Sequence, residues 1–83
     1  MIDVKDATRI ATEHFAELYQ GTYQNLAVEE VELSEDEKHW LVTLGFSVQG
    51  LQSMTAASTT REHKEIRVAT DSGRVVSMRI KRL

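Results

Sequence analysis

The chain has 83 residues, of which 41% are hydrophobic, with no cysteine, no proline and a formal net charge of −3 at pH 7. This length predicts one domain with a small core, and the absence of cysteine excludes disulfides and thiolate metal sites. No apolar run approaches the roughly 20 residues of a membrane-spanning helix, and the first residues lack the pattern of a secretion signal. We therefore expect a cytoplasmic protein that does not contact membranes.

The charges are divided unevenly along the chain. Residues 1–48 hold three Lys or Arg and ten Asp or Glu, whereas residues 49–83 hold seven and three. The simplest interpretation is that acidic and basic strands are neighbours in one sheet, where opposite charges attract. The alternative is that the asymmetry serves a partner. An acidic chain whose longest basic segment is 79–82 is not expected to bind nucleic acid.

The first predicted element is an amphipathic helix that begins at Val4. Asp3 is its expected N-cap, and Gly21 is expected to end it after about five turns. Apolar residues recur at spacings of three and four along this segment: Val4, Ala7, Ile10, Ala11, His14, Phe15 and Leu18. This face is predicted to pack on a sheet.

The next two predicted elements are strands. Alternation in segment 26–33 slips at Glu29 and Glu30, which predicts a bulge there. Segment 39–48 alternates clearly, and its Trp40 series is predicted to face the helix. The indole N–H of Trp40 is expected to meet a carbonyl or water at the sheet margin.

The last twenty residues predict a hairpin. Segments 66–70 and 75–81 are rich in β-formers and flank a polar turn that contains Gly73. Val76, Met78 and Ile80 are expected to share its apolar face. The opposite, outer face of the sheet is expected to carry His39, Thr43, Ser47, Arg67, Ala69, Val75, Ser77, Arg79 and Lys81.

Segment 49–63 has no clear periodicity. It is interpreted as a long loop of the kind that often has a function, and the lone apolar residues Leu51 and Met54 are its candidate contacts. Extended strand ends with a shorter turn are the alternative. The predicted architecture for residues 1–83 is an α+β domain, with one N-terminal helix packed on a four-stranded antiparallel sheet.

With the elements in this order, the chain resembles the PepSY domain family over nearly its whole length. The resemblance is carried by small residues in the helix (Ala7, Ile10 and Ala11), an acidic first strand (28–33), an aromatic-led second strand (40–44) and the closing hairpin (68–75). That hairpin is similar to the family pattern V-D-x-x-T-G-x-V, with Ala69 where the family usually has Asp and Ser72 where it has Thr. The resemblance implies a cystatin-like fold and a non-catalytic role in peptidase inhibition or protein binding, mostly outside the cytoplasm.

No catalytic, cofactor or metal site is predicted. His14, His39 and His63 do not have the spacing that would direct their nitrogens at one ion. The Ser and Thr residues near His63 lie in a polar stretch without a rigid scaffold. The acidic turn 35–37 lacks the glycine and alternating oxygen ligands of a calcium loop.

We interpret the sequence as a small protein-interaction module without catalytic activity, of inhibitory or regulatory type. Its candidate partner-binding residues are Arg67, Arg79, Lys81, Leu51 and Met54. Salt bridges to Glu29 or Glu32 are the structural alternative for the basic residues. A small-ligand site between helix and sheet is the second functional hypothesis, and a homodimer that covers the outer face or closes sheet edges is compatible with either.

Overall fold

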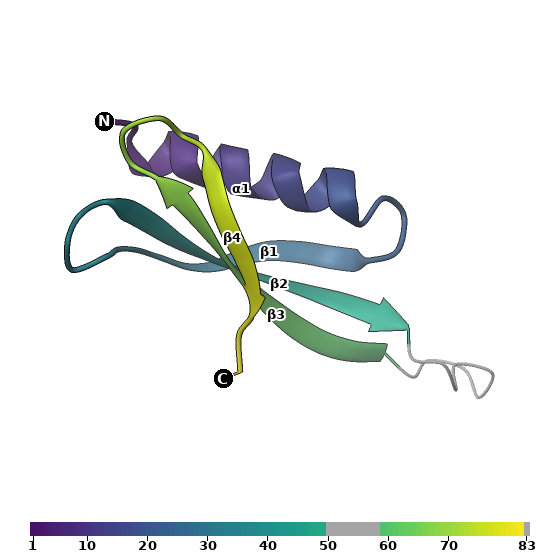
Figure 1. Ribbon diagram of the computed structural model, residues 1–83. Helices are drawn as coiled ribbons and strands as arrows, with labels where there is room; N and C mark the ends of the chain where they lie inside the picture. The colour runs from purple at the N-terminus through teal and green to yellow at the C-terminus, as the bar shows by residue number, and fades with distance from the viewer. Residues whose placement is uncertain (50–58, 83) are drawn as a thin grey trace.

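Helix α1 (Val4–Leu18) lies across one face of a four-stranded antiparallel sheet in the computed structural model (Figure 1). The structure describes residues 1–49 and 59–82. The sheet has the order β1-β2-β3-β4, and its strands are β1 (Gln24–Leu33), β2 (His39–Gln49), β3 (Thr59–Ala69) and β4 (Val75–Ile80). The predicted α+β fold is confirmed.

The helix begins where the sequence predicts because a carboxylate caps it. Asp3 accepts a hydrogen bond from the backbone N–H of Asp6 at 2.9 Å, which satisfies one donor that the first turn leaves unpaired. The helix ends at Leu18, slightly before the expected end. Gly21 has a φ of 71°, a left-handed conformation that glycine adopts without strain, and there the chain turns toward β1.

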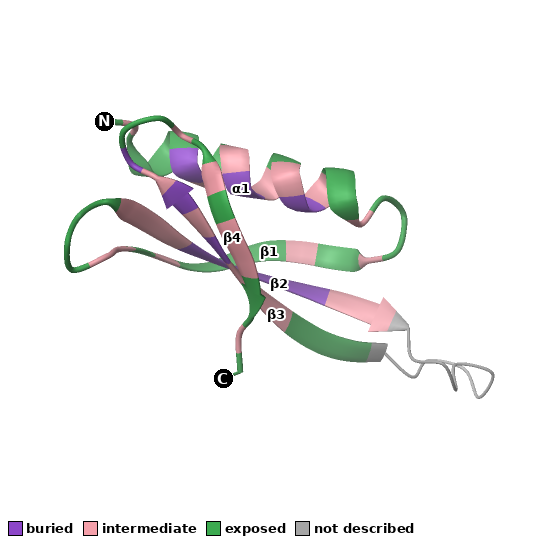
Figure 2. Cartoon of the chain, in the orientation of Figure 1, coloured by how far each residue is buried: buried purple, intermediate pink, exposed green. Residues whose placement is uncertain are grey.

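The core lies between α1 and the two central strands. Figure 2 shows buried residues on the sheet-facing side of the helix, along the middle of β2 and toward the C-terminal end of β3. The core residues are Ala7, Ala11, Phe15, Val42, Leu44, Phe46, Ile66 and Val68. The alanines let the helix approach the sheet closely. The ring of Phe15 lies 4.6–4.9 Å, centroid to centroid, from the rings of Tyr19, Tyr23 and Phe46, so aromatic packing closes the core at the end of the helix.

Thr70 joins three segments that are distant in sequence. Its backbone N–H donates to the carbonyl of Lys38 at 2.9 Å, and its hydroxyl donates to the carbonyl of Glu37 at 2.9 Å. Its own carbonyl accepts from the N–H of Ile2 at 2.8 Å. The Ile2 carbonyl accepts in turn from the indole N–H of Trp40 at 3.1 Å, which confirms the expected environment of this side chain.

The predicted bulge in the first strand is confirmed. Val28 pairs with Leu44 and Glu30 pairs with Thr43, so Glu29 is the extra residue on β1. A bulge lets two successive side chains leave the strand on nearly the same side. Glu29 and Glu30 therefore both reach over the sheet face that is turned away from the helix.

The prediction that strand β3 begins near residue 66 was wrong. β3 begins at Thr59, and residues 59–63 pair with β2 instead of belonging to a loop, which agrees with the alternative of extended strand ends. Near the end of the helix, Nζ of Lys64 lies 5.9 Å from the ring centroid of Tyr19. Beyond that point Thr60 and Glu62 are exposed, so no apolar alternation marks the strand.

The prediction of which sheet face each β4 side chain lies on was also partly wrong. Val75, expected on the outer face, lies opposite Val68 and packs against the core. The cause is a register shift that makes Val76 an extra residue. Of the three residues expected to share the apolar face, Met78 packs against the core, whereas Val76 is 53% and Ile80 69% exposed.

Replacing Thr70 by valine should lower the free energy of unfolding by about 1 kcal/mol, because the carbonyl of Glu37 loses its hydrogen-bond donor while the shape of the side chain is kept. Urea unfolding followed by circular dichroism measures the change. The same exchange at Thr8, whose hydroxyl bonds to the carbonyl of Val4 near the helix surface, should cost less than about 0.5 kcal/mol. Equal effects at the two positions would contradict the joining role of Thr70.

Candidate functional site

β4 is an edge strand whose side chains, apart from Ser77, are basic or apolar. Segment 74–82 contains four Lys or Arg and no Asp or Glu. The backbone N–H of Lys81 donates to the carbonyl of His63 at 3.0 Å, which fixes the direction of the ladder. Since N–H and C=O groups alternate along a strand, those of Met78 and Ile80 point away from β3. We call this outward side of Val75–Ile80 the β4 edge.

The other edge of the sheet is β1, and it is less suited to pairing. Its register with β2 is irregular at two places, and Asn25 has a φ of 55°. It also carries exposed acidic residues, Glu29, Glu30 and Glu32. Bulges and charges of this kind protect edges against strand addition. β4 has one register irregularity, at Val76, and pairs regularly with β3 from Ser77 to Ile80, so the β4 edge is the more open of the two.

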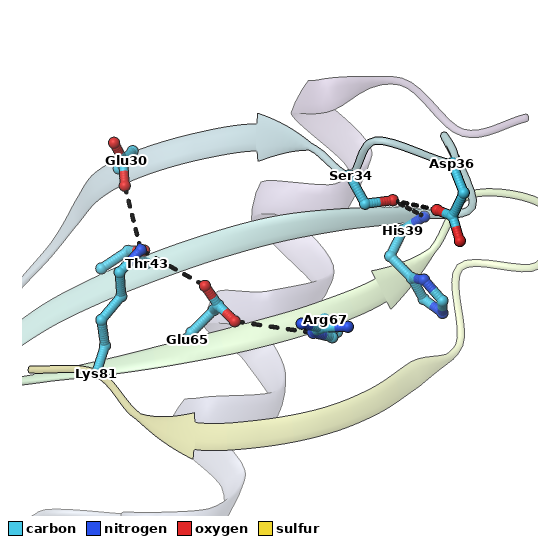
Figure 3. A network of polar contacts seen from close by, with 8 residues as sticks. All are labelled: Glu30, Ser34, Asp36, His39, Thr43, Glu65, Arg67 and Lys81. Atoms are coloured by element: carbon cyan, nitrogen blue, oxygen red, sulfur yellow. Dashed lines mark hydrogen bonds and ion pairs between the residues drawn. The ribbon is translucent and has the colours of Figure 1, made fainter.

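Lys81 is held within the sheet by two carboxylates (Figure 3). Its Nζ lies 3.3 Å from Oε1 of Glu30 on β1, 3.5 Å from Oε2 of Glu65 on β3, and 3.4 Å from the buried hydroxyl of Thr43. Burial alone would lower the pKa of Lys81, but the hydrogen bond and charge of Glu30 and the charge of Glu65 outweigh it and raise this pKa. The Lys81 side chain therefore reaches across the sheet as far as β1, and its charge is already paired with two carboxylates.

The three basic residues predicted to bind a partner, Arg67, Arg79 and Lys81, share the sheet face opposite the helix, but their environments differ. Arg67 Nε lies 3.8 Å from Oε1 of Glu65 (Figure 3), and this buried atom has no hydrogen-bond partner among the described residues. Arg79 is exposed and makes no ion pair within the described part of the chain. Its cross-strand neighbour Glu65 is occupied by Lys81 and Arg67. Among the described residues, Arg79 is thus the one of these three basic residues whose charge is unpaired. The two other predicted partner-binding residues, Leu51 and Met54, lie outside the described residues.

A second ion pair crosses the sheet near the other end of β2. Nη2 of Arg61 on β3 lies 2.8 Å from Oε2 of Glu29 on β1, directly above Gly45 of β2. The hydrogen bond from Arg61 lowers the pKa of Glu29, and the charges of Arg61 and of His63, whose Nε2 is 3.8 Å away, act in the same direction. A Cβ at position 45 would overlap the Glu29 carboxylate. A glycine inside a regular strand was the sequence signal that could have revealed this close approach.

An open recess of about 730 Å³ lies where β4 ends beside β3. It is lined by Thr60, Arg61, Glu62, His63, Ile80, Lys81 and Arg82. The recess thus continues the β4 edge past Ile80 and adds a further exposed cation, Arg82, which makes no ion pair with any residue in 1–49 or 59–82.

The acidic turn between β1 and β2 has a local structural role. Oδ1 of Asp36 accepts hydrogen bonds from the hydroxyl of Ser34 at 2.6 Å and from the N–H of Lys38 at 3.0 Å. These bonds, with that of Ser34 the stronger influence, lower the pKa of Asp36. Within the described residues no group of three or more His, Cys, Asp or Glu is placed to hold a metal ion.

Comparisons of the chain with protein-family models, with curated proteins and with solved structures find no match. In the described ranges, no helix is long and apolar enough to cross a membrane. The functional assignment therefore depends on the geometry of the sheet and its edges.

Replacing Lys81 by glutamate should lower the free energy of unfolding by about 1–2 kcal/mol, since it removes two ion pairs and places three carboxylates together. Replacing Arg79 by glutamate should change it by less than about 0.5 kcal/mol, because this exposed side chain makes no ion pair in the described structure. Urea titrations of both variants test the difference. Equal stabilities would show that the ion pairs of Lys81 contribute nothing.

Replacing Gly45 by alanine should raise the pKa of Glu29 toward its ordinary value of 4.5, because the new methyl group displaces the carboxylate from Arg61. The lowered pKa of Glu29 stabilises the folded state above the ordinary pKa, and this stabilisation is lost as the pH falls through the lowered value. The variant should therefore lose less stability on acidification than the original chain.

The measurement is a carbon NMR titration of the Glu29 carboxyl group, with unfolding followed over the same pH range. Arg61→Gln is the matched control, since it removes the cation but keeps the glycine, and it should raise the same pKa. If the pKa of Glu29 stays low in Gly45→Ala, the close approach over β2 is not required for the ion pair.

Proposed function

We propose that this chain is a small non-catalytic protein-interaction module, of the inhibitory or regulatory type that its PepSY-like sequence pattern suggests. It binds its partner by adding a strand to the β4 edge. The observation that carries the proposal is that Ile80, 69% exposed, stands on an edge strand whose backbone groups at Met78 and Ile80 have no neighbouring strand among the described residues.

Strand addition uses two kinds of contact, and the β4 edge offers both. Main-chain hydrogen bonds to an edge supply affinity, and side chains at alternate positions supply specificity. Val76 and Ile80 offer apolar surface along this edge, and Arg79 offers a charge that the described part of the sheet leaves unpaired. Arg67 and Lys81 lie on the same face, and both pair with Glu65. The Lys81 pair links the end of β4 to β3, whereas the Arg67 pair lies within β3.

The alternative of a small-ligand site between helix and sheet has less support. Phe15, Phe46 and Leu44 are fully buried there, and Phe15 is in ring contact with Tyr19 and Tyr23. The large recess lies outside this interface, beside β3 and β4, and is open. A ligand pocket would instead bury most of its ligand.

Replacing Ile80 by proline should reduce partner capture about tenfold, because the edge loses an outward N–H donor and the fit of an added strand. The measurement is cross-linking and quantitative mass spectrometry with the tagged full chain in lysate of its native host. Ile80→Ala is the matched control, since it removes the same apolar side chain but keeps the N–H.

Both variants should keep the circular dichroism spectrum, because proline is tolerated where the N–H faces outward from an edge strand. Capture that is lost with proline and largely kept with alanine supports strand addition. If the proline variant captures the same proteins as strongly as the original chain, the β4 edge is not the binding surface.

A further inference from the structure

We infer that the segment that adds to β4 is an extended, acidic stretch of a partner protein in which carboxylate and apolar side chains alternate. This inference rests on the proposed function and specifies the chemistry of the partner. It follows from three features of the β4 edge: its alternation, its unpaired charge and the unsuitability of a second copy of this chain.

The alternation of β4 dictates the alternation of its partner. Arg79 stands on the face opposite the helix, across from Glu65, whereas Ile80 stands on the helix side, across from Lys64. Neighbouring strands place their paired side chains on the same face. Residues of an added strand therefore meet Arg79 on one face and the exposed side chain of Ile80 on the other, in alternation.

The charge along the β4 edge selects acidic residues. Three of the cations near the edge are compensated: Lys81 by Glu30 and Glu65, Arg67 by Glu65, and Arg61 by Glu29. Arg79 and Arg82 have no ion-pair partner in the described residues, and segment 74–82 contains no acidic residue. An added strand with a carboxylate beside Arg79 supplies the missing charge, while a basic strand is repelled.

A second copy of this chain is a poorer occupant of the same edge. The β4 strand of another copy carries the same cations, so pairing β4 with β4 brings like charges together. Strand β1 of another copy is acidic, but its two register irregularities interrupt the ladder that strand addition requires, and Glu29 and Glu30 are already paired within their own sheet. The partner is therefore a different protein.

The test uses short peptides of alternating valine with glutamate, glutamine or lysine, titrated into the isotope-labelled full chain and followed by its amide NMR signals. The glutamate peptide should shift the amides of Met78 and Ile80 and bind about tenfold more tightly than the lysine peptide. Arg79→Glu should abolish this preference, and Arg79→Gln should reduce it. Added salt should weaken the binding of the glutamate peptide more than that of the other two peptides.

The outcomes separate the two proposals. Equal binding of all three peptides at Met78 and Ile80 overturns the acidic preference but leaves strand addition standing. Absence of shifts at these amides with every peptide overturns the present inference, and the proposed function is then decided by the capture experiment with Ile80→Pro. Light scattering that shows a dimer lost in Ile80→Pro would assign the edge to a second copy and also overturn the inference.

Discussion

The short length of helix α1 constrains the whole structure. Helix α1 has 15 residues and β2 and β3 have 11 each, which correspond to roughly 22 Å of helix and roughly 36 Å of strand. The helix can bury only part of the sheet. Beneath it the strands carry Val42, Leu44 and Ile66, whereas beyond its last turn β3 presents Thr60 and Glu62 to solvent. The apolar core is consequently small, and much of the sheet depends on polar contacts.

The face opposite the helix is covered by the sheet's own long side chains. Lys81 and Arg61 extend from the basic half of the chain to carboxylates on β1, and they pass over Thr43 and Gly45 of β2, both of which are buried. The small size of these two residues gives the ion pairs their room. The acidic and basic strands are therefore linked across an intervening strand, whereas the sequence analysis expected them to be neighbours.

Local chemistry could be predicted from the sequence where it is decided by adjacent residues. The cap at Asp3, the bulge at Glu29 and the indole contact of Trp40 follow from residue type and alternation. The start of β3 could not be predicted, since a strand without a helix over it has no apolar periodicity. The inward turn of Val75 depends on an extra residue opposite β3, which alternation alone does not reveal.

The candidate surface was only partly predictable for a related reason. The shared face of Arg67, Arg79 and Lys81 follows from strand parity, and this much agrees with the structure. Which of these charges is compensated depends on carboxylates 16 and 51 residues away from Lys81 in sequence. The sequence analysis proposed Glu29 and Glu32 as salt-bridge partners, whereas Glu30 and Glu65 are the partners of Lys81.

The links between Ile2, Lys38 and Thr70 also bear on how the protein is made. Because the first residues of the chain are held by a residue near its C-terminal end, the N-terminal helix cannot be fixed in place while only the first two strands have left the ribosome. The core residues Ile66 and Val68 are also synthesised only after the first two strands. Folding during synthesis is thus expected to be delayed until the last hairpin emerges, and the nascent chain exposes the apolar side of its helix until then.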